Sequence, residues 1–399
     1  MKLAVYGGAF NPPHLGHLYA AKAVLNRIRP DKLIVIPTAD PPHKSLAEDT
    51  PSNHDRLELL RRTMPRDGRI EISDTEILRH GKSYTRTTVE QLLLKYPDAE
   101  IFLMIGTDML ETFEQWYSFK WILEKVTLVA FGRRNDEAHR VRHHAQALRD
   151  KHGARIMHVE NRKVDISSTR LRAALTHRQG LEYLTESAYG YIIKKRLYNA
   201  QPDLKWLRER SAVYLDKNRI AHVRGCEQEA VSLAQRWGAD EGLAAESAVL
   251  HDITKNLSRD KQLKLYKRYG IMTDKIKGNN IKLYHAETGA CFAKEQFGIP
   301  DCVADAIFWH TTGKPGMSLL AQILYMADYI EPGREFDGVE ALRSLAYENL
   351  DGALALGLKM SIDELTERGR IPHSATISAY EYFNARYTGS DDFSETGSN

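Results

Sequence analysis

The first residues whose types and spacing could carry chemistry lie near the start of the chain. An apolar run over residues 3–7 leads into Gly7-Gly8, and His14 and His17 follow at the start of an expected helix. Glycines let a phosphate approach the backbone, and a helix N-terminus offers unpaired N–H groups. Two imidazoles on one face of the first turn can donate hydrogen bonds to phosphate oxygens. A turn followed by structural histidines is the alternative, which the complete string GGAFNPPHLGH disfavours.

Other polar residues at expected loops and element ends fit the same chemistry. Lys44 follows two prolines on a loop, where an ammonium group can reach a phosphate. Gly106 and Asp108 end an apolar strand, at the edge where open α/β sheets bind ligands, and a carboxylate there can bond a ribose hydroxyl. Ser167-Ser168 precede a helical run with Arg172, which is a second helix start suited to phosphate. Plain helix N-caps remain an alternative for Asp108 and the serines.

Residue types that bind metal ions gather in the second half of the chain. A His-Asp pair follows an apolar helical run, and a further Asp lies within the apolar string ILYMADYIE. Imidazoles and carboxylates that converge from separate helices make a metal site in a helical bundle, and they suit iron or manganese. Each residue alone is more often a satisfied core group. Together they form the candidate ligand set His222, His251, Asp252, His285, His310 and Asp328.

The elements that must position these residues fall into two classes. Before residue 200, short apolar runs alternate with helical periodicity, which predicts βαβ units and an α/β doubly wound parallel sheet. The expected strands are 3–7, 32–37, 100–106, 125–131 and 155–160, and the expected helices are 15–28, 54–64, 87–95 and 137–151. The later residues show helical patterns without strand signals, at 218–237, 240–255, 259–269, 284–297, 300–311, 317–331, 338–366 and 374–387.

Composition sets the class of protein. The chain has 399 residues, 42% of them apolar and 27% charged, which is ordinary for two globular domains. Three cysteines exclude a disulfide scaffold and an all-cysteine zinc site. Without an apolar stretch for a membrane helix or a signal peptide, we expect a cytoplasmic protein with neither membrane nor nucleic-acid partners. Residues 1–200 carry 32 Lys and Arg against 24 Asp and Glu, and the remainder carry 24 against 29, so the two halves differ in charge.

The string GGAFNPPHLGH resembles the HxGH nucleotidyltransferases. Further segments over about residues 1–198 are similar to the nicotinate-nucleotide adenylyltransferase branch, namely PPHK (41–44), SYT (83–85), IGTD (105–108), Trp116 and ISSTRLR (166–172). The resemblance implies a Rossmann-like fold that uses Mg²⁺ with ATP. The phosphate of nicotinate mononucleotide would attack the α-phosphorus of ATP, giving deamido-NAD and pyrophosphate without a protein nucleophile. A nucleotidyltransferase acting on phosphopantetheine is the alternative, which the PPHK and SYT segments disfavour.

The same resemblance assigns roles to single residues. The catalytic set it implies is His14, His17, Lys44 and Arg172. The ATP site would comprise Gly7, Gly8, Phe10, His17, Gly106, Asp108, Ile166, Ser167, Ser168 and Arg172. The nicotinate-nucleotide site would comprise Lys44, Tyr84, Thr85, Trp116, Tyr117 and Arg133. Asn11 and Thr87 stand where the family usually has Asp.

The order His222, His251-Asp252, Asp328 resembles the HD phosphohydrolase superfamily, and the added His285 and His310 are similar to its dinuclear members. The strings HTTGKPGMSLL (310–320) and ADYIEPGREFDGVE (327–340) are similar to bacterial HD-domain bis(5'-nucleosyl)-tetraphosphatases, which split diadenosine tetraphosphate symmetrically into two ADP. This implies two divalent metals, with Asp252 as the bridging ligand. Contacts to phosphate oxygens would come from Lys255, His310 and Arg334, and Lys255 joins the catalytic residues.

The sequence therefore predicts a fusion of two enzymes. Residues 1–200 would form the adenylyltransferase domain, 201–207 a linker, 208–388 an HD phosphohydrolase domain and 389–399 a disordered tail. The alternative keeps the adenylyltransferase but makes the helical half a regulatory nucleotide-binding module, or a hydrolase of a different substrate.

Overall fold

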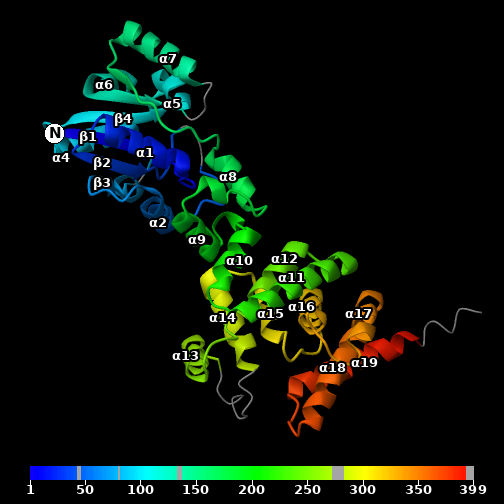
Figure 1. Ribbon diagram of the computed structural model, residues 1–399. Helices are drawn as coiled ribbons and strands as arrows, with labels where there is room; N and C mark the ends of the chain where they lie inside the picture. Colours follow the sequence, from blue (N-terminus) through cyan, green and yellow to red (C-terminus); the bar gives the residue numbers. More distant parts are fainter. Residues whose placement is uncertain (43–45, 80, 133–136, 272–282, 392–399) are drawn as a thin grey trace, which may run out of the picture. The chain divides into compact units, whose positions relative to one another are not determined.

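The computed structural model describes residues 1–42, 46–79, 81–132, 137–271 and 283–391 (Figure 1). The chain divides into two compact units, Met1–Pro202 and Asp203–Asn399, and each is described by itself. Within the described ranges, no helix is both long and apolar enough to cross a membrane.

The first unit is built on six strands in the order β3-β2-β1-β4-β5-β6, and every neighbouring pair is parallel. The strands are β1 Lys2–Gly8, β2 Lys32–Pro37, β3 Ile70–Ile72, β4 Glu100–Gly106, β5 Val126–Phe131 and β6 Ile156–His158. Strand order reverses between β1 and β4, so the sheet is doubly wound as predicted. Because helices cover both faces, the central strands read as continuous apolar runs, and every residue of β5 is buried.

The helices of this unit form a layer on each face of the sheet. They are α1 Leu15–Arg27, α2 Asn53–Thr63, α3 Thr75–Leu78, α4 Thr85–Lys95, α5 Thr107–Glu111, α6 Phe119–Lys125, α7 Glu137–His152, α8 Ser168–Leu175 and α9 Glu186–Lys195. Short 3₁₀ turns lie at η1 Phe113–Gln115, η2 Leu181–Tyr183 and η3 Leu197–Asn199. One core contains Val89 of α4, Ile122 of α6 and Val141 of α7, and the core on the opposite face contains Val24 of α1 and Leu60 of α2.

The second unit is helical within the described residues, as predicted. Its helices are α10 Leu204–Ala212, α11 Lys217–Trp237, α12 Glu241–Leu250, α13 Arg259–Tyr269, α14 Tyr284–Phe297, α15 Asp301–Trp309, α16 Leu319–Ile330, α17 Val339–Glu348, α18 Leu350–Glu367 and α19 Ser374–Asp391. Helix α16 is apolar because most of its residues are buried against other helices of the unit.

Three of the larger differences from the predicted element boundaries lie in the second unit. The expected helix 338–366 is two helices, because Asn349 adopts an extended backbone and its side chain accepts the Gly352 N–H to cap α18. The expected helix 240–255 ends at Leu250, and His251 and Asp252 lie in the turns that follow. Part of the expected linker is helical, because Asp203 caps α10 by accepting the Trp206 N–H.

Strand β3 was not predicted, since all three of its residues are only partly buried and give no apolar run. In the expected tail, α19 continues to Asp391, and residues 392–399 lie outside the described residues.

Candidate functional sites

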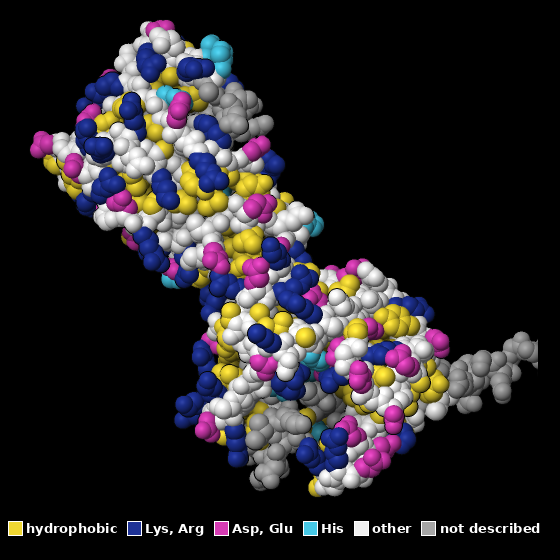
Figure 2. Space-filling view, viewed as in Figure 1, with side chains coloured by type: hydrophobic (Ala, Val, Ile, Leu, Met, Phe, Trp, Pro, Cys, Tyr) yellow, Lys and Arg dark blue, Asp and Glu magenta, His cyan; other side chains and the backbone are white. Residues whose placement is uncertain are grey.

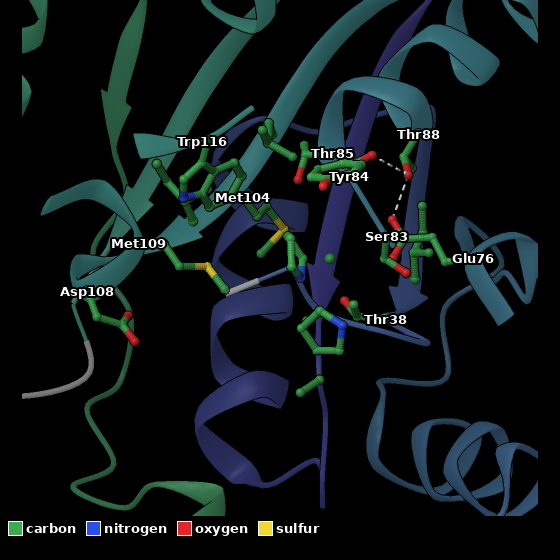
Figure 3. A pocket seen from close by; sticks show the side chains of 18 of the residues that line it. Thr38, Glu76, Ser83, Tyr84, Thr85, Thr88, Met104, Asp108, Met109 and Trp116 are labelled. Carbon is green, nitrogen blue, oxygen red and sulfur yellow. Dashed lines mark hydrogen bonds between the residues drawn. The ribbon is translucent and has the colours of Figure 1, made fainter. Parts of the chain in front are cut away.

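A large cavity opens at the carboxyl ends of β1 and β4, where the strand order of the first unit reverses. It has a volume of about 920 Å³. Open α/β sheets bind ligands at such a reversal. Expected site residues that line it are Gly7, Gly8, Tyr84, Thr85, Asp108, Trp116, Tyr117, Ser168 and Arg172. In Figure 3, Trp116, Met109 and Asp108 lie on one side of the cavity, and Glu76, Ser83 and Thr88 lie on the other.

The two glycines at the end of β1 differ in their surroundings. A Cβ atom on Gly7 would meet no atom within 4 Å, so the backbone there is open to a ligand. A Cβ atom on Gly8 would lie 3.2 Å from the ring of Phe10. The Phe10 side chain is buried in the core against Tyr6 and His17, so it is no part of the cavity wall. Of the two glycines, Gly7 is therefore the one with open space beside its Cα atom.

His14 and His17 are fixed by the N-terminus of α1. His14 is the N-cap, and its Nδ1 accepts the Gly16 N–H at 3.2 Å. His17 is the third helical residue, and its Nδ1 accepts the His14 N–H at 3.1 Å. His14 therefore precedes the helix, whereas the sequence placed both residues on the first turn. Because both Nδ1 atoms accept, each neutral ring carries its proton on Nε2, which is the donor that a phosphate oxygen needs.

Arg172 and Asn11 tie the loop after β1 to the rest of the cavity. Arg172 Nη1 donates to the Asn11 carbonyl at 2.7 Å, and its Nε lies 3.3 Å from Asp49. The Asn11 amide donates to Thr50 Oγ1 at 2.7 Å, while the Thr50 hydroxyl donates to the Ala47 carbonyl. The Asn11 amide thus ties the loop to Thr50, a contact that an ionised Asp could make only by accepting from the Thr50 hydroxyl in place of the Ala47 carbonyl.

The expected nicotinate side of the cavity is aromatic. The rings of Tyr84 and Tyr117 have centroids 4.9 Å apart, and Trp116 packs at the same distance from Phe113. Tyr117 is exposed. Thr85 is the first residue of α4 and Tyr84 is its N-cap. A flat pyridine ring fits such a wall.

Besides Phe10, expected residues that the structure describes but that are not among those lining the cavity are His14, His17, Gly106, Ile166 and Ser167. Lys44 and Arg133 fall outside the described residues. Gly106 is the N-cap of α5, and Ser167 caps α8 by accepting the Arg170 N–H. The side chain of Ile166 is buried. Thr87 lies on α4 and is not among the described residues that line the cavity.

The sequence missed Glu76, a buried carboxyl group in the cavity wall. It lies on the short helix α3 and accepts a hydrogen bond from Thr88 Oγ1 at 2.6 Å (Figure 3). Burial raises the pKa of Glu76, although its hydrogen bonds and Arg79 oppose the shift. Residues 75–78 carry no signal that would have singled it out.

The six expected metal ligands of the second unit converge on one point. They come from the second turn of α11, the turn after α12, the start of α14, the C-cap of α15 and the last turn of α16. Each of the imidazoles is within 4.0 Å of a carboxylate oxygen of Asp252 or Asp328. Figure 2 shows a hollow on this unit with histidine side chains in it and Lys and Arg side chains beside it.

Asp252 stands at the centre of this cluster. Its Oδ1 lies 3.0 Å from His285 Nε2 and 3.7 Å from His310 Nε2. Its Oδ2 lies 3.4 Å from His251 Nε2 and 3.7 Å from His222 Nε2. The two oxygens of one carboxylate thus face two different pairs of imidazoles. Asp328 Oδ1 completes the second pair at 3.0 Å from His222 Nε2.

Groups outside the cluster turn the imidazoles toward its centre. His251 Nδ1 lies 2.7 Å from the Ala248 carbonyl, and His310 Nδ1 lies 2.6 Å from the Ile307 carbonyl. With Nδ1 donating outward, each Nε2 has its lone pair available for a metal ion. The Nε2 atoms of His222 and His251 and Oδ1 of Asp252 are buried and make no hydrogen bond of suitable geometry. This donor set therefore fits divalent ions such as iron or manganese.

Three cations surround the cluster. Arg219 Nη1 lies 2.7 Å from Asp252 Oδ2, and Arg334 Nη2 lies 2.7 Å from Asp328 Oδ1. Lys255 Nζ lies 3.7 Å from Asp252 Oδ1. The sequence pointed to Lys255 and Arg334 but missed Arg219. The available signal for Arg219 was its spacing, because it lies three residues before His222 and so on the same face of α11.

Burial and charge act against each other at this cluster. Burial raises the pKa of Asp252, but His251, His285 and His310 outweigh it and hold that pKa well below its usual range. Burial lowers the pKa of His285 to about 4, and the nearby Asp252 only partly opposes this shift. The His285 ring therefore stays neutral at physiological pH, the form that binds a metal ion.

Comparison with known proteins separates the same two halves. The Cytidylyltransferase-like family matches residues 5–174, and the HD domain family matches residues 219–333. A probable nicotinate-nucleotide adenylyltransferase of Shouchella clausii is 33% identical over 195 residues, which cover 49% of this chain and 95% of that protein.

A symmetrical bis(5'-nucleosyl)-tetraphosphatase of Halalkalibacterium halodurans is 37% identical over 169 residues, covering 42% of this chain and 89% of that protein. A crystal structure from Clostridium acetobutylicum, described as a predicted HD superfamily hydrolase involved in NAD metabolism, is 35% identical with a TM-score of 0.43. It covers 46% of this chain and 97% of that one. The chain therefore belongs to the nicotinate-nucleotide adenylyltransferase family through its first half and to the HD-domain hydrolases through its second.

Proposed function

We propose that the first unit transfers AMP from ATP to nicotinate mononucleotide, releasing pyrophosphate and forming deamido-NAD. The observation that supports this most strongly is the cavity at the reversal of strand order, with Gly7 open to a phosphate and His14 and His17 fixed at a helix N-terminus. The relatives of this half carry the corresponding activity in their names.

The residues of the chain can account for this reaction by positioning and charge stabilisation. A phosphate oxygen of nicotinate mononucleotide forms a bond to the α-phosphorus of ATP, and the bond to the β-phosphate oxygen breaks. The Nε2–H groups of His14 and His17 donate to phosphate oxygens as negative charge develops, and Arg172 holds a phosphate by its guanidinium. Mg²⁺ bound with ATP would neutralise further charge. Asp108, on α5 just after the end of β4, lines the cavity and would accept from a ribose hydroxyl.

The nicotinate ring is assigned to the aromatic wall of the cavity. Trp116 would stack on the ring, and backbone N–H groups near Thr85 and Tyr117 would donate to the carboxylate. These assignments give the first unit a preference for the nicotinate over the nicotinamide nucleotide. Initial rates with the two mononucleotides at equal ATP test the proposal, and equal kcat/KM would contradict it.

We propose that the second unit hydrolyses diadenosine tetraphosphate with water to two molecules of ADP at a dinuclear metal site. The supporting observation is the position of Asp252, whose two carboxylate oxygens face different imidazole pairs. His222, His251 and Asp328 would hold one ion, His285 and His310 the other, and Asp252 would bridge them. Two ions at such a site activate water and stabilise charge on phosphate oxygens.

The cations at the rim suit a polyphosphate substrate. Lys255 and Arg219 contact Asp252, and Arg334 contacts Asp328, so all three lie within reach of phosphates bound at the ions. Symmetrical cleavage breaks one bond between a central phosphorus and the bridging oxygen, with water supplying the new oxygen. Each ADP leaves with two phosphates.

A regulatory nucleotide-binding module is the alternative for this half. A regulatory module would need no metal ligands, and the convergence of six candidate ligands in the described residues therefore favours the hydrolase. Incubation of the metal-loaded chain with diadenosine tetraphosphate, followed by mass spectrometry, separates the cases. ADP alone supports the proposal, AMP with ATP indicates a different hydrolase, and unchanged substrate indicates a regulatory module.

A further inference from the structure

We infer that Glu331 is a positioning residue for His222 and that it makes the two halves of the metal site unequal in affinity. This inference rests on the proposed dinuclear site. The term His222 half means the ligands His222, His251 and Asp328 together with Oδ2 of Asp252. The term His285 half means His285 and His310 together with Oδ1 of Asp252.

Glu331 directly follows α16 and is buried. Its Oε1 lies 3.1 Å from His222 Nδ1, and its Oε2 accepts the Gly333 N–H at 2.6 Å. A carboxylate can only accept here, so Nδ1 of His222 carries a proton, and Nε2, which lies 3.0 Å from Asp328 Oδ1, is the nitrogen that can bind an ion once it has released its own proton. His251 and His310 are instead oriented by neutral backbone carbonyls. A carboxylate partner increases the basicity of the metal-binding nitrogen more than a carbonyl does.

Two glycines make room for this carboxylate. A Cβ atom on Gly225, one turn along α11 from His222, would clash with Glu331 Oε2. A Cβ atom on Gly333 would lie 3.0 Å from the same oxygen. The backbone of α11 can therefore approach the carboxylate only because residue 225 has no side chain. The displaced atom would be the end of a flexible side chain, so a methyl group at position 225 moves the carboxylate while keeping its charge.

The charges around the two halves differ. The His222 half has Asp328 as a ligand and Glu331 behind it, whereas Lys255 Nζ lies 3.0 Å from His285 Nε2. Arg219 and Arg334 also contact the carboxylates of the His222 half, but both are partly exposed and can turn into solvent when an ion binds. An ion in the His222 half therefore binds first and tightly, and an ion in the His285 half exchanges more readily.

A manganese titration of the full chain tests the inference. The protein is stripped with a chelator and titrated with Mn²⁺, and free Mn²⁺ is followed by electron paramagnetic resonance. The wild-type chain should bind one ion tightly and a second more weakly. Glu331→Gln and Gly225→Ala should each weaken the tight site by roughly 10- to 100-fold, the usual effect of losing a partner of a metal-binding histidine. Gly357→Ala on α18, where the new Cβ would make ordinary contacts, is the matched control and should bind like wild type.

The outcomes separate this inference from the proposed function. A wild-type chain that binds no Mn²⁺ would overturn the dinuclear site itself, and the inference with it. Two ions of equal affinity, or variants within twofold of wild type, would overturn only the role of Glu331. The Tm of the metal-free variants is measured alongside. An orienting role leaves it close to that of wild type, whereas a large fall in both variants would make Glu331 a structural residue instead.

Discussion

The imidazole of His17 accepts the backbone N–H of His14 at 3.1 Å, and the ring centroids of these two residues are 3.9 Å apart. One pair of side chains thus caps α1 and, in the proposed reaction, presents two Nε2–H donors to phosphate. The capping fixes the tautomers before any nucleotide binds, so the donors need little reorganisation as charge develops.

This relationship predicts the effect of His17→Ala. Alanine removes the Nε2–H donor together with the Nδ1 atom that accepts the His14 N–H, so the Tm of the variant is measured to show that the fold is retained. With the donor lost, kcat of the adenylyltransferase should fall by roughly 10²- to 10³-fold while nucleotide binding changes little. Stopped-time assays with ATP and nicotinate mononucleotide measure kcat, and calorimetric titration measures ATP binding. Near-normal turnover would show that His17 only caps the helix.

The aromatic wall predicts substrate preference. Replacing the nicotinate carboxylate by an amide leaves backbone N–H groups unpaired, at about 1–3 kcal/mol each, which is roughly tenfold or more in kcat/KM per group. Trp116→Ala should raise the KM for nicotinate mononucleotide more than it raises the KM for ATP. Thr87 lies outside the described cavity wall, so Thr87→Asp should leave the preference unchanged. A preference that shifts with Thr87→Asp would mean that α4 reaches the nucleotide.

The position of Asp252 predicts a linked loss of metal and hydrolysis. Asp252→Asn removes one charge and weakens the ligand that both ions would share, so bound metal and cleavage of diadenosine tetraphosphate should fall together. Asp363→Asn is a matched control, because Asp363 forms an exposed pair with Lys359 on α18. Metal analysis and product analysis are made on the same preparation. Full hydrolysis with reduced metal would argue against a bridging role.

The histidine cluster predicts how the stability of the metal-free chain depends on pH. Burial lowers the pKa of His285 to about 4, and it also lowers the pKa of His310. Between the ordinary histidine pKa near 6.5 and about 4, the unfolded chain binds protons that the folded chain does not, so stability falls on acidification through this range. For His251, burial is outweighed by Asp252 and the pKa is raised, which offsets part of the loss.

Calorimetry of the chelator-treated chain from pH 7 to pH 4.5 measures this dependence. His285→Gln, which cannot titrate, should flatten the profile relative to wild type. A wild-type unfolding temperature that does not fall on acidification would contradict the assignment of His285 as a neutral buried ring.

The sequence predicted the sheet and the metal ligands for identifiable physical reasons. The strands β1, β2, β4 and β5 are buried on both faces. Each is therefore a continuous apolar run, which distinguishes it from the helices in the sequence. The ligands His251 and Asp252 follow an apolar helix, which made two adjacent polar residues conspicuous. The split between α17 and α18 was missed because Asn349 interrupts an apolar pattern that continues on both sides.

The residues that the sequence missed act through contacts between distant segments. Glu331 contacts His222 from the far end of α16, and nothing in the string around it indicates that partner. Glu76 lies on a four-residue helix and faces the cavity through its contact with Thr88. The reciprocal capping of His14 and His17 depends on where α1 begins, and helix boundaries are not fixed by periodicity.

The central claim is that one chain carries two separate active sites, and a crossed pair of variants tests it most directly. Wild type, His17→Ala and Asp252→Asn are each assayed for both reactions under one set of conditions with Mg²⁺ and Mn²⁺ present. The account predicts that His17→Ala loses deamido-NAD synthesis and keeps hydrolysis of diadenosine tetraphosphate, and that Asp252→Asn shows the reverse. Loss of both activities in either variant, or the absence of one reaction from the wild-type chain, would contradict it.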